Sequence, residues 1–128
     1  YLFSNTLAPA TVGASLKVLE MLENSTSLCD AVTRNALYFR QKIEQAGFTV
    51  NKGETAIVPV MIFDAPMAVR FADLLLNEGI YVIGFVYPVV PQGKARIRVQ
   101  LSAAHTLSQI DKAVDAFVKI GKQLHVIN

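Results

Sequence analysis

The chain has 128 residues, of which 52% are hydrophobic and 17% are charged, and its formal net charge is +2. This length suits one compact domain, and the composition excludes an intrinsically disordered chain. The small net charge gives no basis for binding nucleic acid or an anionic membrane, and no apolar run reaches the roughly 18 residues of a membrane span.

Two helices are predicted in the first third of the chain. Pro9 suits the first turn of a helix, where its missing N–H costs nothing, and helical apolar spacing continues to about residue 23. The second helix is predicted from about Leu28 to Ala46, with Ser27 as its N-cap and Gly47 just beyond its end. Its predicted apolar stripe consists of Leu28, Val32, Ala36, Phe39 and Ile43.

Strands are predicted where β-branched and aromatic residues gather, at residues 48–50, 56–63, 80–86 and 95–101. Pro59 lacks an N–H donor and should therefore lie near the start of its strand or on a non-pairing side. The run at 80–86 is almost wholly apolar, which favours a central, covered strand. Residues 87–93 contain two prolines and predict a long, stiff loop close to polyproline geometry.

Two further helices are predicted from their capping residues. Asp64 is the expected N-cap of a helix that ends at Gly79, and Thr106 with Gln109 forms a capping-box pattern before the last helix. The resulting order is helix, helix, strand, strand, helix, strand, strand, helix. It predicts an α+β fold, with a small, mostly antiparallel sheet and helices packed on one face. The expected buried line of the last helix is Ile110, Val114, Phe117, Gly121 and Leu124.

The chemically most informative residues are Arg96 and Arg98, which stand two apart on a strand and therefore share a face. A guanidinium held rigidly on a strand suits a carboxylate or a phosphate, because its planar donors match two oxygens at once. The simpler interpretation is a pair of solvated arginines on an exposed sheet face. The pattern by itself favours the simpler interpretation and leaves the anion site as the alternative.

Other polar residues carry weaker signals. Ser4 and Asn5 precede a helix that starts with proline, where they could bind an anion or simply cap the helix. His105 and His125 are far apart with no third ligand spaced to either, so no metal site is expected, and His105 fits a hydrogen-bonded structural role. Cys29 is the single cysteine and has no nucleophile context, which favours a buried or half-exposed helical position.

Several segments together resemble the α-oxoamine synthases, which are pyridoxal 5'-phosphate (PLP) enzymes of the aspartate aminotransferase fold. The similarity extends over essentially the whole chain, and it implies the C-terminal part of such an enzyme. In that arrangement residues 1–25 are a linker and long helix that would join a large PLP domain, and residues 26–128 are the small α+β domain. The similar segments are residues 1–9, 79–85, 87–91, 93–98 and 101–106.

The resemblance also implies roles for particular residues. The second arginine of the Ala-Arg-Ile-Arg run, Arg98, would bind the carboxylate of the amino-acid substrate, and Arg96 receives no role. Ser4 and Asn5 would contact the PLP phosphate of the neighbouring subunit in a homodimer. The loop at 87–93 would form a wall of the active site. The lysine that holds PLP is expected before Tyr1, so no catalytic residue is assigned here and the chain alone is expected to be inactive.

Within the family, the amino-acid sequences of these segments most resemble the branch that condenses glycine with acetyl-CoA to 2-amino-3-oxobutanoate and CoA. This resemblance implies a role in threonine breakdown and a location in the cytoplasm. Two alternatives stay open. One is another α-oxoamine synthase, such as 8-amino-7-oxononanoate synthase, and the other is a stand-alone carboxylate-binding α+β module. If a large domain is missing, apolar surface should be exposed around residues 1–20.

Overall fold

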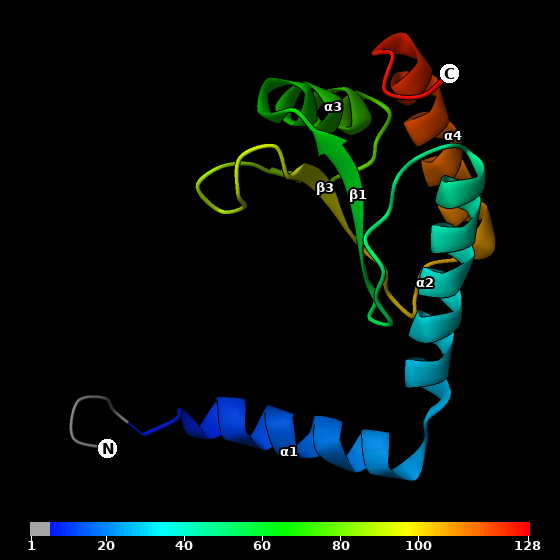
Figure 1. Ribbon diagram of the computed structural model, residues 1–128. Helices are drawn as coiled ribbons and strands as arrows, with labels where there is room; N and C mark the ends of the chain where they lie inside the picture. The colour runs from blue at the N-terminus through cyan, green and yellow to red at the C-terminus, as the bar shows by residue number, and fades with distance from the viewer. Residues whose placement is uncertain (1–5) are drawn as a thin grey trace.

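The computed structural model describes residues 6–128 and has the predicted α+β architecture (Figure 1). The predicted strand at 48–50 is absent as a strand: only a single antiparallel bridge joins Val50 to Val60. Strand β1 is therefore the first strand of the sheet. The described elements are α1 (Pro9–Asn24), α2 (Ser27–Gln45), β1 (Ile57–Phe63), α3 (Ala65–Asn77), β2 (Ile83–Phe85), β3 (Ala95–Gln100) and α4 (Leu107–Gln123).

The sheet has the strand order β1-β3-β2, and both pairings are antiparallel. Strand β3 is therefore the central strand, and the prediction of a central strand at 80–86 is wrong. Only Ile83–Phe85 form a strand there, at the sheet edge, and Tyr81 and Ile83 are exposed. The apolar run arose for another reason, since Ile80, Val82 and Val86 pack against the core from the edge.

Pro59 lies where its missing donor does no harm. Its Cα is paired with Arg98 of β3, and Met61, two residues further on, donates its N–H to Thr49 on the opposite side of β1. Residues two apart on a strand point their N–H groups to the same side, so the proline nitrogen faces residues 49–51 and not its ladder partner β3. This agrees with the predicted non-pairing position.

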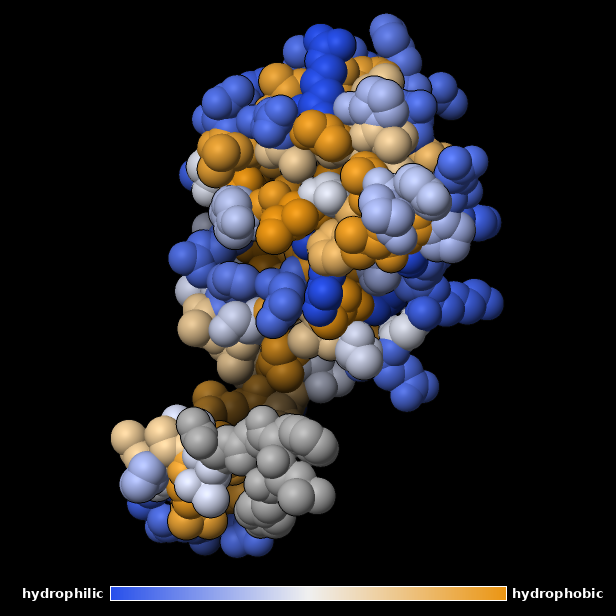
Figure 2. Space-filling model, turned by 90° about the vertical axis from the view of Figure 1, so that its left-hand side faces the viewer, coloured by the Kyte–Doolittle hydropathy of each residue, from blue (hydrophilic) through white to orange (hydrophobic). Residues whose placement is uncertain are grey.

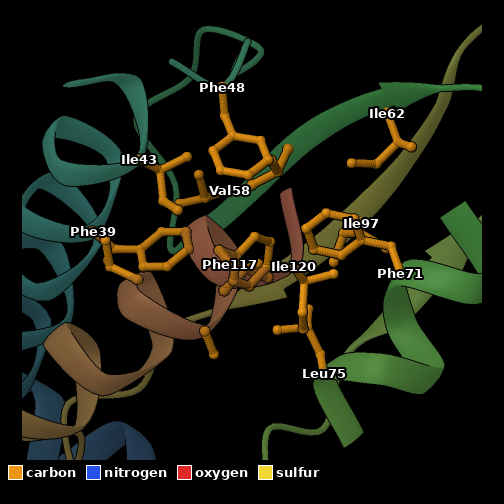
Figure 3. Packing of buried hydrophobic residues seen from close by; sticks show 14 of the residues in the cluster. Phe39, Ile43, Phe48, Val58, Ile62, Phe71, Leu75, Ile97, Phe117 and Ile120 are labelled. Carbon is orange, nitrogen blue, oxygen red and sulfur yellow. The ribbon is translucent and has the colours of Figure 1, made fainter. Parts of the chain in front are cut away.

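The core lies between one face of the sheet and the helices α2, α3 and α4 (Figure 3). At its centre Phe39, Phe71 and Phe117 are fully buried, with ring centroids 5.8 Å apart for Phe39 and Phe117 and 5.4 Å apart for Phe71 and Phe117. Each comes from a different helix, so this aromatic cluster joins the three helices to one another. No helix of the described chain covers the opposite face of the sheet (Figure 1).

Most predicted helix ends are confirmed. Asp64 accepts a hydrogen bond from the Met67 N–H at 2.8 Å, and Thr106 and Gln109 exchange both bonds of the capping box. Gly79 has φ 78° at the end of α3, in the left-handed region that a C′ glycine adopts most easily. The predicted cap of α2 is wrong, because Ser27 is already helical and Thr26 precedes it. The residues predicted to form the buried line of the last helix are all buried, with Leu124 just beyond the end of α4.

Helix α1 extends away from the rest of the molecule and none of its residues is buried (Figure 1). Leu16 is 62% exposed and Leu19 is 58% exposed, which confirms the expected apolar surface for the described part of residues 1–20. The start of α2 is open as well, since Leu28 is 54% exposed although it belongs to the predicted stripe. Cys29 is exposed rather than buried or half-exposed, because it lies on this unpacked first turn.

Candidate functional site

The candidate site is the uncovered face of the central strand. Along β3, Ala95, Ile97 and Val99 are buried against the helices, while Arg98 and Gln100 are exposed on the other face. The strict alternation follows from the two-residue repeat of a strand, so the arginines share a face as predicted. Neighbouring strands on both sides hold β3 in place, and Arg98 stands opposite Pro59 on β1 and Ile83 on β2.

Arg98 is oriented by an aromatic side chain rather than by an acid. Its guanidinium carbon lies 5.4 Å from the ring centroid of Phe85, a cation–π contact that still leaves the edge N–H groups free. Within residues 6–128, the ion pairs are Lys17–Glu20, Lys42–Asp111 and Lys119–Glu78, and none includes Arg98. The guanidinium therefore presents its donors to an anion from outside the described chain.

A hollow of about 520 Å³ opens beside Arg98. One wall is apolar and consists of residues around β2, and the other is the polar row that continues from Arg98 along β3. Its lining includes neither a lysine nor a carboxylate. A single cation beside apolar side chains suits a small carboxylate, because nothing in the hollow repels it. The main lining residues are Tyr81, Ile83, Phe85, Arg98, Gln100 and His105.

The side of the molecule from which residues 87–93 project in Figure 1 faces the viewer in Figure 2 and is partly apolar. Hydrophobic patches lie among hydrophilic side chains on the compact part of the molecule. Tyr81 and Ile83 are exposed apolar residues that line the hollow, and Tyr87 and Val89 are exposed on the loop at 87–93.

The loop at 87–93 folds into turns rather than a polyproline run. Val89 and Val90 both donate their N–H groups to the Val86 carbonyl, and Lys94 donates to the Pro91 carbonyl. These bonds pull the loop back on itself, so the expected polyproline geometry is wrong. The loop lines a separate hollow of about 280 Å³ with the start of α3, and none of residues 87–93 lines the hollow beside Arg98.

His105 has the hydrogen-bonded structural role expected from the sequence. Its Nδ1 accepts a hydrogen bond from the Ser102 N–H at 3.1 Å. The turn from Ser102 to His105 is fixed further by Asn35, a buried residue of α2, which donates to the Ser102 carbonyl at 2.9 Å and to the His105 carbonyl at 2.8 Å. Asn35 was not predicted as a functional residue, and the available signal was its position as a polar residue next to Ala36 and near Phe39 of the apolar stripe.

The remaining predicted site residues can be located only in part. Ser4 and Asn5 lie outside the described residues. Arg96 is partly buried and stands opposite Phe85 and Met61. Among residues 6–128, no three His, Cys, Asp or Glu side chains gather closely enough to hold a metal ion. No helix in that part of the chain combines the length and the apolar character needed to cross a membrane.

Comparison with known proteins agrees with this architecture. The sequence pattern of the aminotransferase class I and II family matches residues 1–117. The 2-amino-3-ketobutyrate coenzyme A ligase of Salmonella typhimurium is 60% identical over 99% of this chain, and the mitochondrial Homo sapiens protein of that name is 51% identical over 95%. The chain spans 32% and 29% of these two relatives, or about a third of their length.

Comparison with solved structures shows which fold the chain has. A serine palmitoyltransferase from S. paucimobilis with bound PLP–myriocin superposes with a TM-score of 0.91 and 27% identity, over 98% of this chain and 32% of that one. An 8-amino-7-oxononanoate synthase from Francisella tularensis superposes with a TM-score of 0.80 and 26% identity, over 96% of this chain and 36% of that one. The fold is therefore that of PLP-dependent enzymes.

The chain belongs to the aminotransferase class I and II family. Within that family it falls in the α-oxoamine synthase group, as the resemblance of its motifs predicted.

The described residues fit one part of such an enzyme's site. A lysine amine and a set of phosphate contacts are what the cofactor itself requires, and the hollow beside Arg98 offers no lysine. Its donor set, one unpaired guanidinium next to apolar side chains, instead suits the carboxylate of the substrate. The two residues predicted to contact the PLP phosphate, Ser4 and Asn5, are not among those described.

Proposed function

We propose that this chain is the C-terminal part of a PLP-dependent glycine C-acetyltransferase, also called 2-amino-3-ketobutyrate CoA ligase. The enzyme would join glycine and acetyl-CoA to give 2-amino-3-oxobutanoate and CoA. The carbon–carbon bond forms between the glycine α-carbon, which loses a proton, and the thioester carbonyl, from which CoA leaves as a thiol. The observation that carries the proposal is the unpaired Arg98 guanidinium on the central strand. The identity of 60% to the Salmonella ligase supports the choice of branch.

Arg98 would bind the glycine carboxylate through two parallel hydrogen bonds. The strand fixes its backbone between two neighbours, and Phe85 limits the orientation of its guanidinium. A carboxylate held in this way has a fixed position relative to the α-carbon, so the proton to be removed is presented in one direction. When bound, PLP supplies the electron sink that makes the loss of this proton feasible.

The proposed function also assigns roles to residues outside the hollow beside Arg98. Ser4 and Asn5 would contact the PLP phosphate across a homodimer, and the loop at 87–93 would close one side of the assembled site. Residues 1–25 would connect residues 26–128 to a large domain that contains the cofactor lysine. The open apolar surface of α1 supports this division, because Leu16 and Leu19 lack a partner within the described chain.

The enzyme would act in threonine breakdown. The higher identity to the bacterial ligases, compared with the mammalian proteins whose names include "mitochondrial", supports a cytoplasmic location.

The test is steady-state kinetics of the full-length enzyme with glycine and acetyl-CoA. Arg98→Met removes a charge-assisted bidentate contact, and we expect kcat/KM for glycine to fall about 100-fold. Arg98→Lys keeps the charge but not the planar fork and should recover only part of the loss. Arg96→Lys is the matched control on the same strand and face, with an unchanged KM for glycine expected. Equal effects at Arg96 and Arg98 would contradict the assignment.

The alternative within the family is that the enzyme is a different α-oxoamine synthase. The 43% identity to an 8-amino-7-oxononanoate synthase from Thermoanaerobacter pseudethanolicus favours this alternative. A panel of small amino acids and acyl-CoA thioesters given to the full-length enzyme separates the two. A clear preference for a pair other than glycine and acetyl-CoA would replace the proposed activity. Binding of small carboxylates by the 128-residue chain alone, in a protein without PLP activity, would favour the stand-alone module.

A further inference from the structure

The sheet opens beyond Arg98 and leaves a gap. Pairing between β2 and β3 ends at Ile83 and Arg98, although β3 continues to Gln100. Two hollows border this gap, the one of about 520 Å³ beside Arg98 and another of about 430 Å³ beside the start of α4. The two hollows meet and form one groove, because they have five lining residues in common: Tyr81, Val82, Gln100, Leu101 and His105.

Polar groups follow one another along this groove. Arg98 lies in the first hollow, Gln100 and His105 line both, and Lys112 lines the second. Lys112 takes part in none of the ion pairs within residues 6–128. The groove therefore has Arg98 in one hollow, Lys112 in the other, and the hydrogen-bonding side chains of Gln100 and His105 where the two hollows meet.

The orientation of the His105 ring is fixed by a hydrogen bond within the turn from Ser102 to His105. Because Nδ1 accepts the Ser102 N–H, the neutral imidazole carries its proton on Nε2, which stays available as a donor. The two bonds from buried Asn35 fix the backbone on both sides of the turn. A surface turn held by this many bonds suits a residue whose orientation matters for binding.

The groove is too long for glycine. A glycine carboxylate occupies Arg98 alone, whereas Gln100 already lies about 7 Å further along the strand, and Lys112 lines only the second hollow. A second ligand must be extended, with amides for the middle of the groove and an anionic group for its far end. On the proposed function, the second substrate has these features in this order.

We propose that this groove binds the pantetheine arm of acetyl-CoA. Gln100 and His105 hydrogen-bond the amides of the arm, His105 through its Nε2–H, and Lys112 attracts the phosphates at its end. The apolar wall that includes Tyr81 packs against the methylene groups. Arg98 and this row would then present the two substrates side by side, with the thioester next to the glycine α-carbon.

The test measures CoA binding to the full-length enzyme by titration calorimetry, together with separate KM values for acetyl-CoA and glycine. His105→Asn keeps an acceptor for the Ser102 N–H but lacks a donor at Nε2, and Gln100→Ala removes the neighbouring amide. Each should weaken CoA binding about three- to tenfold and raise the KM for acetyl-CoA equally, with an unchanged KM for glycine. His105→Gln returns an amide N–H to the reach of Nε2 and should recover part of the affinity.

The charge at the far end is tested separately. Lys112→Gln should weaken CoA binding about threefold at low salt, with the difference vanishing at high salt, while Lys122→Gln on the same helix serves as control. A wild-type enzyme that fails to bind CoA would overturn the proposed function itself. A wild type that binds CoA with His105→Asn and Gln100→Ala unchanged, or with a raised KM for glycine instead, would overturn the groove assignment alone.

Discussion

The two faces of β3 are made by the same six residues but are used differently. On the inner face Ile97 is fully buried among helices α2 to α4, and on the outer face Arg98 and Gln100 are exposed beside an open hollow. The inner face derives stability from burial, whereas the outer face leaves a guanidinium without a partner. A strand that is rigid because of one face can thus hold a binding group on the other.

The largest expected effect comes from making the same substitution on the two sides of the sheet. In this 128-residue chain, Ile97→Ala removes a fully buried side chain and should lower the free energy of unfolding by about 3 kcal/mol. Ile83→Ala removes one that is 51% exposed and should cost less than about 1 kcal/mol. Urea denaturation of both variants measures the difference. Equal losses would mean that the outer face is packed in solution.

A smaller effect is expected at Asn35, whose side chain holds the turn from Ser102 to His105. Asn35→Ala leaves the carbonyls of Ser102 and His105 without their side-chain donor and should cost about 2 kcal/mol. Asn24→Ala removes a single hydrogen bond, from the side-chain amide to the Glu20 carbonyl on exposed α1. It should lower the free energy of unfolding by less than about 0.5 kcal/mol. Thermal unfolding of the two variants compares them. A negligible change at Asn35 would show that solvent replaces its bonds and that the turn is not held from within.

The end of β1, which also pairs with β3, contains a strained residue. Phe63 has φ 68° and is 47% exposed, and the Asp64 N–H closes a tight turn onto the Ile62 carbonyl at 2.8 Å. A side chain with a Cβ is unfavourable in this region, so Phe63→Gly should be more stable than Phe63→Ala by about 1 kcal/mol. Chemical denaturation of the pair isolates the backbone term, since both variants lack the ring. The reverse order would mean that Phe63 relaxes out of this conformation.

The smallest effect concerns the contact between α2 and α4. Hydrogen bonding to Tyr38, and then attraction to the Asp111 carboxylate 3.4 Å away, raise the pKa of Lys42 above its usual 10.5. The raised pKa means that the contribution to stability is complete below about pH 10.5 and is lost as the pH rises through the folded-state pKa. Unfolding followed from pH 9 to about pH 12 should show a slightly shallower decline for Lys42→Met than for the wild type. Parallel curves would contradict this account.

Local patterns predicted much of this molecule. The alternation at 95–101 predicted which side of the strand carries Arg98, and the capping residues Asp64 and Thr106 predicted where two helices begin. These features depend on residues two to four positions apart, which a linear sequence displays directly. The role of Arg98 in substrate binding came from family resemblance, and it stays a prediction until the full-length enzyme is tested.

Only the tertiary structure decided the rest. An apolar run at 80–86 indicates burial but not strand order, and long-range pairing made β3 central and Ile83–Phe85 an edge. Asn35 reaches residues 67 and 70 positions away, a distance over which no sequence period operates. The gap beside Gln100 likewise exists because two strands stop pairing at Arg98. The sequence alone determined most of the helices and strands and the face of Arg98, whereas the neighbours of that face were decided by contacts between residues remote in the chain.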